Sequence, residues 1–372
     1  MSETVQVHAQ AMEVAAGWSP PGGPQSWQLT AALFRLIAGH DDLLAGLAGL
    51  PAERLPALLA SAAISFLVRR DEPEPLSEYF PRPGRPQPAF DDGFSRPAAA
   101  FVSDRLDEIM AICASHRYQM NEVARCSQIA IGIAALRTRT AGSIALIDLG
   151  TGAGFGLQLD RYRYRLQGTG TGPDPAGLDL SCAVRGQRQP PLPELPLISY
   201  RAGIEASPVD LEDPASRAWL MACAPPEVSA LDRLAAAIEV SRQHPVPIAA
   251  GDAVDALPGV LAGLPPGQDV LVTDAYLAVF LPPERRARLI EVLADAGRAR
   301  PVTWLSLDPL VPLGPRGRDS VQGLALPTSL VSQYQQEGVF AVLGARSFGG
   351  AFGDAQLLAR AHPSGQWIEW LS

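Results

Sequence analysis

Residues 144–156, IALIDLGTGAGFG, combine a short apolar run, one aspartate and glycine at every second position. The apolar run is continuous and contains β-branched residues, as expected for a parallel strand that is buried on both faces. Four glycines so close together lower local stability, because glycine loses the most backbone entropy on folding. They therefore indicate a very tight turn after the strand, or a ligand that approaches the backbone closely.

Four similar runs follow along the chain, and helical patterns separate most of them. The runs are PLISYRAGIE, PVPIAAGDA, QDVLVTDAYLAVF and RPVTWLSLD, and two more strand candidates near the end are GVFAVLGARS and QWIEWLS. A Pro/Gly-rich insertion at residues 168–196 interrupts the pattern. Strands and helices that alternate at this spacing predict an α/β domain with an open, doubly wound sheet over residues 141–372.

The part of the chain before residue 141 shows the periodicity of helices instead. Apolar side chains recur at i, i+3 and i+4 in residues 26–70, which predict two helices, and again in residues 98–139. Between them, residues 71–97 contain seven prolines, a density that excludes a helix and indicates an extended connector. We therefore expect an all-helical N-terminal domain, residues 1–140, that caps the sheet domain and contributes to substrate binding.

Composition excludes several classes of protein. The 372 residues carry a formal net charge of −9 and no basic stripe with interleaved aromatic residues, which argues against nucleic acid as a partner. All 30 basic residues are arginine, so mechanisms that need a lysine, such as a Walker-type phosphate loop or a Schiff base to pyridoxal phosphate, are excluded. No GxSxG, HExxH or paired-carboxylate motif supports a hydrolase.

The sequence also has no sign of a membrane span or a secretion signal. No apolar run is long enough for a transmembrane helix, and the first residues lack a basic-then-apolar signal segment. We therefore expect a cytoplasmic protein without membrane contact. The four cysteines form no CxxC pair, which predicts buried free thiols and no metal site. They are Cys113, Cys126, Cys182 and Cys223.

In a doubly wound sheet the ligand lies beyond the carboxyl ends of the strands. Asp148 closes the first strand, and Gly150, Gly152 and Gly154 form the turn into the expected next helix, whose N-terminal end is electropositive. A dinucleotide turn has the spacing GxGxxG, whereas the third glycine here comes one position early. The sequence DLGTGAG instead matches acidic-x-G-x-G-x-G, the pattern of S-adenosylmethionine (SAM) binding in class I methyltransferases. The alternative is a tight strand–helix junction without a ligand.

Two later acidic residues fit the same cofactor. Glu205 ends the second expected strand, where one carboxylate can accept hydrogen bonds from both ribose hydroxyls. Asp252 follows the third strand, where the exocyclic amine of adenine needs an acceptor. A helix cap or a solvated turn is the alternative for each carboxylate alone, but with Asp148 three of them follow consecutive strands. Glu205 lies 57 residues after Asp148, and the insertion accounts for this long spacing.

Five longer segments occur in the same order as in a known family. They are MNEVARC (120–126), DLGTGAGFGLQLDRYRY (148–164), RAGIEASPVDLEDPASRAWLMA (201–222), AAGDAVDALP (249–258) and AVFLPPERRARL (278–289). Together they resemble a large, mostly uncharacterised bacterial family, common in actinobacteria, with a class I SAM-methyltransferase-like core behind a helical N-terminal domain. The resemblance covers nearly the whole chain, and it implies this fold and SAM as the cofactor.

The chain departs from this family after the fourth expected strand. Members often carry a histidine–serine pair at this place, which faces the reactive methyl group, whereas this chain has Asp274 and Tyr276 in TDAYL. Either side chain could orient or deprotonate an acceptor, so both are catalytic candidates, and the chemistry of this chain is expected to differ from that of its relatives.

Two further segments provide candidates for the reaction. In DRYRY, Tyr162 and Tyr164 can stabilise a sulfonium by cation–π attraction, unless they are core residues of a half-buried strand. In NEVAR, Asn121 and Arg125 lie one helical turn apart, with Glu122 on a neighbouring face. These side chains can hold the methionine carboxylate or an acceptor, or make polar contacts within the protein. We treat Asn121 and Tyr162 as catalytic candidates, and Glu122, Arg125 and Tyr164 as substrate-binding candidates.

Three functions are open from the sequence. The first is an enzyme that transfers the methyl group of SAM to a small molecule, because a helical cap and an acidic surface suit an enclosed pocket. The second is cyclisation of SAM to azetidine-2-carboxylate with release of methylthioadenosine, as in azetidine-2-carboxylate synthases, which also resemble class I methyltransferases. For that reaction Asn121, Tyr162 and Tyr276 could fold the methionine chain and support the sulfonium. The third is a non-catalytic SAM-binding protein.

Overall fold

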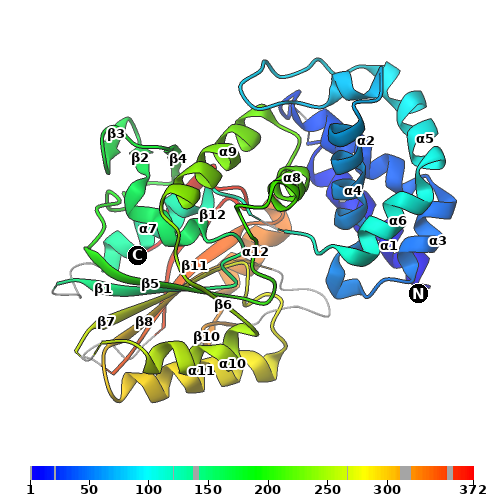
Figure 1. Ribbon diagram of the computed structural model, residues 1–372. Helices are drawn as coiled ribbons and strands as arrows, with labels where there is room; N and C mark the ends of the chain where they lie inside the picture. The colour runs from blue at the N-terminus through cyan, green and yellow to red at the C-terminus, as the bar shows by residue number, and fades with distance from the viewer. Residues whose placement is uncertain are drawn as a thin grey trace. The chain divides into compact units, whose positions relative to one another are not determined.

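The computed structural model of the protein describes residues 2–20, 22–119, 121–136, 142–265, 267–310, 320–349 and 355–372. The chain divides into two compact units (Figure 1). The helical unit comprises Met1–Asn121 and Asp210–Ala235, and the sheet unit comprises Glu122–Val209 and Ala236–Ser372. The prediction of a mixed α/β protein with an N-terminal helical region is confirmed. Of the predicted segments, Met120 and residues 137–141 lie outside the described residues.

The described helices of the helical unit pack around a shared apolar core. The helices are α1 (Glu3–Gly17), α2 (Trp27–Ala38), α3 (Asp41–Ala48), α4 (Pro56–Asp71), α5 (Ser95–Asp104), α6 (Leu106–Ser115) and α8 (Pro214–Cys223). Residues 26–70 thus form three α-helices rather than the predicted two. The reason is that α2 ends at Ala38 with Gly39 as its C-cap, and His40 caps a new helix by accepting the N–H of Leu43 at 3.3 Å.

Most of residues 71–97 form the extended connector that their prolines predict. Two short 3-10 turns interrupt it, η2 (Leu76–Tyr79) and η3 (Asp92–Phe94). The N–H of Gly84 donates to the carboxylate of Asp232 at 2.8 Å, and the side-chain oxygen of Gln87 accepts the N–H of Val228 at 2.9 Å. These hydrogen bonds tie the connector to the second segment of the same unit.

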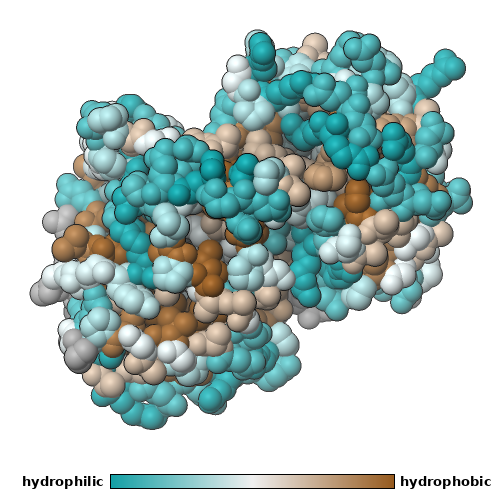
Figure 2. Space-filling model, viewed as in Figure 1, coloured by the Kyte–Doolittle hydropathy of each residue, from teal (hydrophilic) through white to brown (hydrophobic). Residues whose placement is uncertain are grey.

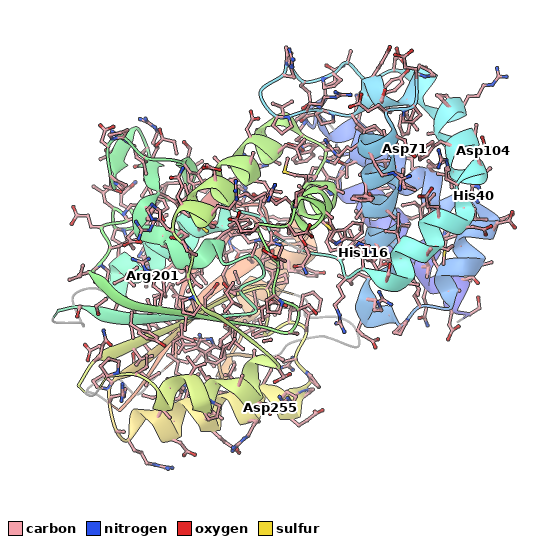
Figure 3. The ribbon with its side chains drawn as sticks, viewed as in Figure 1. His40, Asp71, Asp104, His116, Arg201 and Asp255 are labelled. Atoms are coloured by element: carbon pink, nitrogen blue, oxygen red, sulfur yellow. The ribbon has the colours of Figure 1, made fainter. Side chains whose placement is uncertain are left out.

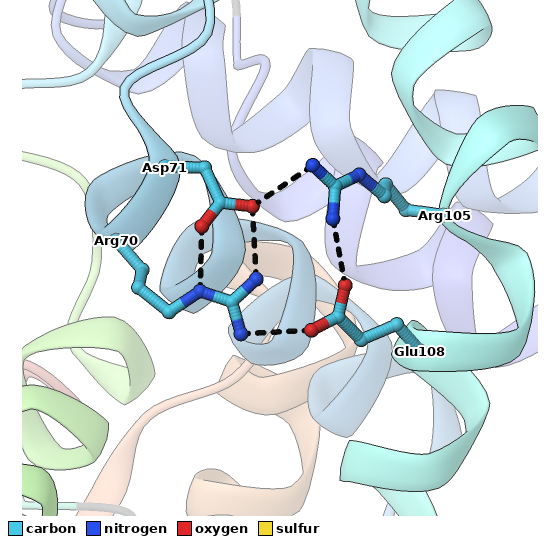
Figure 4. Close-up of polar contacts among 4 residues, drawn as sticks. All are labelled: Arg70, Asp71, Arg105 and Glu108. Carbon is cyan, nitrogen blue, oxygen red and sulfur yellow. Dashed lines mark hydrogen bonds and ion pairs between the residues drawn. The ribbon is translucent and has the colours of Figure 1, made fainter.

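Four charged side chains connect α4 to the start of α6 at the surface of the helical unit (Figure 4). Arg70 contacts Asp71 at 2.6 Å and Glu108 at 2.8 Å, and Arg105 contacts the same two carboxylates at 3.2 and 3.0 Å. The hydrogen bonds from Arg70 hold the pKa values of both carboxyls below their usual range. Because all four side chains are partly exposed, water and salt screen the network, and it adds little to the free energy of unfolding.

Five parallel strands form the centre of the sheet unit, and all five follow runs that the sequence predicts. They are β1 (Ile144–Leu149), β5 (Ile198–Glu205), β6 (Ile248–Ala250), β7 (Asp269–Ala275) and β8 (Val302–Pro309). Their spatial order is β6-β5-β1-β7-β8. The carboxyl end of β1 therefore meets the carboxyl ends of β5 and β7 at one edge of the sheet.

The sheet continues beyond β8 with strands from the end of the chain, from the insertion and from the residues directly before the insertion. These are β11 (Ala341–Phe348), β12 (Gln356–Ala361), β13 (Trp367–Trp370), β4 (Asp179–Arg185), β2 (Arg163–Leu166) and β3 (Thr169–Thr171). In the described residues they follow β8 in the spatial order β11-β12-β13-β4-β2-β3. β12 and the strands of the insertion were not predicted from the sequence. In β4, buried Leu180 and Cys182 alternate with exposed neighbours, but glycine- and proline-rich flanks obscure this two-residue period.

Helices cover both faces of the central strands. α10 (Ala253–Ala262) and α11 (Pro283–Gly297) share a core with the apolar residues of β1. α7 (Arg125–Leu136), which the sequence analysis assigned to the N-terminal domain, lies on the opposite face. There Gly132 is so close to Leu305 that a Cβ would meet its methyl groups at 3.0 Å. The other described α-helices and strands are α9 (Val228–Gln243), which both units share, β9 (Ser320–Val321), β10 (Leu324–Ala325) and α12 (Thr328–Glu337).

The surface and the thiols agree with the composition. The face shown in Figure 2 is largely hydrophilic, with smaller, separate hydrophobic areas. Within the described ranges, no helix combines the length and the apolar character needed to cross a bilayer.

All four cysteines are buried and free, as predicted, and burial raises the pKa of Cys113 and Cys223 to about 12. These thiols are therefore protonated at neutral pH.

Candidate functional site

The turn after β1 adopts a backbone conformation that glycine takes most easily. Gly150, Gly152 and Gly154 have φ angles of 63°, 58° and 81°, in the left-handed region. Gly156 has an ordinary φ angle, but a Cβ at this position would lie 2.6 Å from Oδ2 of Asp148. The four glycines therefore permit a tight turn whose backbone returns to the carboxylate at the end of β1.

The residues after the turn do not form the predicted α-helix. Phe155–Arg161 is a 3-10 segment, η5, and Gln158 within it has non-helical angles (φ −108°, ψ 16°). Arg201 of β5, labelled in Figure 3, donates to Asp160 at 2.7 and 2.6 Å and to the carbonyl of Leu157 at 2.7 Å. That carbonyl would otherwise accept an α-helical hydrogen bond. Without aligned α-helical turns, η5 does not supply the electropositive helix end that the sequence analysis expected.

Asp148 is held from two sides at the end of β1. It is only 8% exposed, and its Oδ2 accepts the hydroxyl of Thr151 at 2.7 Å while its Oδ1 accepts the hydroxyl of Thr273 at 2.6 Å. Burial raises the pKa of Asp148 to about 6; the two hydroxyls oppose this shift, and the charge of Glu205 adds to it. The carboxyl group therefore titrates close to neutral pH.

Glu205, at the end of β5, reaches the glycine turn. Its Oε2 accepts the N–H of Gly152 at 3.0 Å, and its Oε1 accepts the N–H of Ser207 at 3.1 Å. Each carboxylate oxygen keeps a second lone pair for another donor. Gly203 of the same strand permits this approach, because a Cβ there would lie 2.6 Å from the methyl group of Thr151. The structure thus brings the end of β5 and the glycine turn together.

Asp252 follows β6 and caps α10. Its Oδ1 accepts the N–H groups of Val254 at 2.8 Å and Asp255 at 3.1 Å, and it also pairs with Arg285. A helix cap is the alternative that the sequence analysis weighed against adenine binding. Since these contacts all use Oδ1, the second oxygen keeps its capacity to accept a hydrogen bond from a ligand.

Asp274 ends β7 and lies in a buried network with a second acid, Asp308 of β8. Asp274 accepts the indole N–H of Trp304 at 2.7 Å. The hydroxyl of Ser306 lies between the two acids, 3.3 Å from Asp274 and 2.7 Å from Asp308. All four residues are at most 1% exposed. Asp274 is therefore a buried, hydrogen-bonded group rather than one that faces solvent.

Tyr276 and Arg125 form a stacked pair at the same edge of the sheet. The guanidinium of Arg125 lies 3.7 Å from the centre of the Tyr276 ring. Tyr276 has a left-handed φ of 67°, which is rare for a residue with a side chain. Burial raises the pKa of Tyr276 to about 12; Arg125 opposes the shift, and the charges of Asp308 and Glu122 add to it. The phenol is therefore a neutral hydrogen-bond donor at ordinary pH.

The other sequence candidates have partners within the protein. Tyr162 and Tyr164 are 0% and 2% exposed, and their hydroxyls donate to backbone carbonyls at 3.1 and 2.6 Å. They are core residues, which is the alternative weighed for them. The side chain of Asn121 donates to that of Gln119 at 3.5 Å, and the side chain of Glu122 accepts the N–H of Ala124 at 3.1 Å. The prediction that Asn121 and Arg125 lie one helical turn apart is wrong, because α7 begins only at Arg125.

The hydroxyl side chains around these acids were not among the residues predicted from the sequence. Thr273 lies beside Asp148 in the register of β1 and β7, and Ser306 lies beside Asp274 in the register of β7 and β8. These pairs depend on strand register, which no local pattern in the sequence shows. Asp308 could have been found, because it ends the run RPVTWLSLD as Asp148 ends the first run.

Comparison with known proteins places the whole arrangement in one family. Residues 22–370 match the family model described as "Uncharacterized protein conserved in bacteria (DUF2332)". No curated protein matches the chain. The matched residues include the glycine turn, Glu205 and the stacked pair of Arg125 and Tyr276. The chain therefore belongs to this bacterial family.

Proposed function

We propose that the protein is a SAM-dependent enzyme that acts on a small molecule by methyl transfer. The contact between Glu205 and the glycine turn carries the proposal. Because the carboxylate accepts the N–H of Gly152 at 3.0 Å, a ligand that lies on the turn can also reach the carboxylate. The ribose of SAM fits this arrangement, since its two neighbouring hydroxyls can each donate to a carboxylate oxygen.

The order of the parallel strands supports the same cofactor. β5 and then β6 extend the sheet on one side of β1, and β7 and then β8 extend it on the other side. In doubly wound sheets the ligand lies beyond the carboxyl end of the strand at such a switch point, which is where the glycine turn is found here. On these grounds we assign the sheet unit to the doubly wound, class I methyltransferase-like type.

Methyl transfer requires an acceptor beside the methyl carbon. The lone pair of the acceptor forms a bond to that carbon, the carbon–sulfur bond breaks, S-adenosylhomocysteine leaves, and the acceptor loses a proton. Tyr276 is a neutral phenol, so it can orient an acceptor but does not deprotonate it at neutral pH. Asp274 is covered by Trp304 and Ser306. In this proposal the side chains accelerate the reaction mainly by positioning, which is worth up to about 7–11 kcal/mol.

Replacement of Glu205 by alanine is expected to weaken S-adenosylhomocysteine binding by about 2 kcal/mol, roughly 30-fold, because the ribose loses a charged acceptor. Glu205→Gln keeps one carbonyl oxygen and should lose less. Isothermal titration calorimetry measures both variants. Glu291→Ala, which removes an exposed carboxylate on α11, is the control. An affinity of Glu205→Ala equal to that of the control would remove the ribose assignment.

The products formed from SAM test the reaction. We expect SAM to stay intact when it is incubated with the pure protein, and to become S-adenosylhomocysteine only when an acceptor is added. Mass spectrometry would detect a different outcome for cyclisation, in which the α-amine attacks the γ-carbon and releases methylthioadenosine with azetidine-2-carboxylate. Binding of SAM without any product, across a panel of small-molecule acceptors, would indicate a non-catalytic binding protein.

A further inference from the structure

Among the described residues, no carboxylate pairs with the buried charge of Arg125. The residue is 8% exposed, and its Nε donates to the carbonyl of Pro363 at 2.7 Å. Across the described residues, Arg125 forms no ion pair, and its two terminal nitrogens have no hydrogen-bond partner. A buried charge is costly unless an opposite charge or good hydrogen bonds compensate it. The guanidinium also stacks on the ring of Tyr276.

Tyr276 has an equally incomplete environment. Its hydroxyl oxygen is buried and has no hydrogen-bond partner among the described residues. The left-handed backbone that places this side chain costs on the order of 1–3 kcal/mol in a residue other than glycine. Buried hydroxyl groups are normally hydrogen-bonded, and strained residues concentrate at functional sites. Arg125 and Tyr276 therefore present unused donors side by side.

These donors lie near the proposed cofactor site. Leu277, the neighbour of Tyr276, lies against the glycine turn, where a Cβ on Gly150 would meet it at 3.2 Å. β7, which ends directly before Tyr276, pairs with β1 up to Leu149. A group bound by Arg125 and Tyr276 would thus lie at the same edge of the sheet as Asp148.

The charges around the pair indicate which chemical group it binds. A guanidinium and a neutral phenol can both donate, so they match an oxygen anion. Yet the charges of Glu122 and Asp308 also act on Tyr276, and they would oppose a dianion such as phosphate. A group that combines a carboxylate with an ammonium suits this environment, because its carboxylate matches the guanidinium and its ammonium matches the two acids. We infer that Arg125 and Tyr276 bind the carboxylate of an α-amino acid group.

Two sources can supply this group. One is the methionine end of SAM, an assignment that rests on the proposed function, and the other is a separate amino-acid substrate. Binding of S-adenosylhomocysteine, methylthioadenosine and L-alanine separates them. Methylthioadenosine has the nucleoside but no amino-acid end, and L-alanine has the amino-acid group alone. Calorimetry is used for the two nucleosides, and ligand-observed NMR at millimolar concentration for L-alanine and inorganic phosphate.

The two test variants are Arg125→Ala and Tyr276→Phe. Arg185→Ala is the matched control, because the guanidinium of Arg185 also stacks on an aromatic ring, 4.2 Å from the centre of the Trp367 ring. We expect Arg125→Ala to lose about tenfold or more in affinity for the amino-acid group, and Tyr276→Phe about fivefold. Tyr276→Phe should leave the urea midpoint of the free protein unchanged, because its hydroxyl has no partner there. The Tyr276→Phe variant therefore still tests the inference if Arg125→Ala does not fold.

Each result has a definite meaning. Loss of S-adenosylhomocysteine binding with constant methylthioadenosine binding assigns the group to the cofactor. Constant binding of both nucleosides with loss of L-alanine binding assigns it to a separate substrate. The inference is overturned if Tyr276→Phe binds S-adenosylhomocysteine and L-alanine like the control, if the wild type binds neither, or if phosphate binds more tightly than L-alanine. If the wild type binds neither nucleoside, the proposed function fails, whereas the L-alanine measurement still decides this inference.

Discussion

Gly156→Ala is expected to lower the free energy of unfolding by about 3 kcal/mol and to weaken S-adenosylhomocysteine binding by about tenfold or more. The new Cβ would lie 2.6 Å from Oδ2 of Asp148. That oxygen accepts the hydroxyl of Thr151, and the other carboxylate oxygen accepts the hydroxyl of Thr273. The carboxylate therefore cannot move aside without breaking a buried hydrogen bond, and the glycine turn would shift instead.

Urea unfolding and calorimetry measure the two effects. Gly259→Ala is the matched control, because Gly259 lies in the exposed part of α10 with no atom near its missing Cβ. This control should leave binding unchanged and make the protein more stable by up to about 1 kcal/mol, the usual gain of alanine over glycine in a helix. Equal stability of the two variants would mean that the turn does not need the close approach of Asp148.

Asp148→Asn is expected to change how stability depends on pH. The folded-state pKa of Asp148 is raised from 3.8 to about 6, chiefly by burial, so between these values the folded protein binds more protons than the unfolded chain. The free energy of unfolding of the wild type, relative to Asp148→Asn, should therefore fall as pH rises from about 4 to about 6. The total change is roughly 3 kcal/mol, and the difference should be constant above about pH 7.

The difference between the two proteins isolates this carboxyl group. His362, whose pKa burial lowers to about 4, makes the opposite contribution, since the unfolded chain binds its proton and stability rises with pH. That contribution is present in both proteins and cancels in the difference. Urea unfolding at half-unit steps of pH provides the measurement. A difference that stays flat from pH 4 to 7, or that rises with pH, would contradict the raised pKa of Asp148.

The strands of the sheet centre could be predicted because their signals are local. β1, β7 and β8 are mostly buried runs rich in apolar residues, and β5 is buried over its second half. Each of the four ends in or near an acid. The left-handed angles of Gly150, Gly152 and Gly154 are also a local matter, since glycine takes such angles without a steric penalty. Because the strands are parallel, the acids at their carboxyl ends are expected at the same edge of the sheet.

The segment after the turn could not be predicted, because a distant residue determines it. Apolar spacing in residues 155–161 suits a helix, but Arg201, about 40 positions later, takes the carbonyl of Leu157 and pairs with Asp160. Likewise, DRYRY has the aromatic residues that a sulfonium needs, yet the pleat turns Tyr162 and Tyr164 into the core. Composition alone could not separate these alternatives.

By itself the sequence determined the helical region, the parallel strands, the glycine turn and the acids at the strand ends, because each depends on neighbours along the chain. Only the tertiary structure decided which side chains meet. Thr273 bonds to Asp148 through strand register, and Gly156 is required because a carboxylate eight residues earlier returns to it. Arg125 and Tyr276 are 151 positions apart in the sequence. They stack because α7 packs against the sheet, and no pattern within either segment predicts this packing.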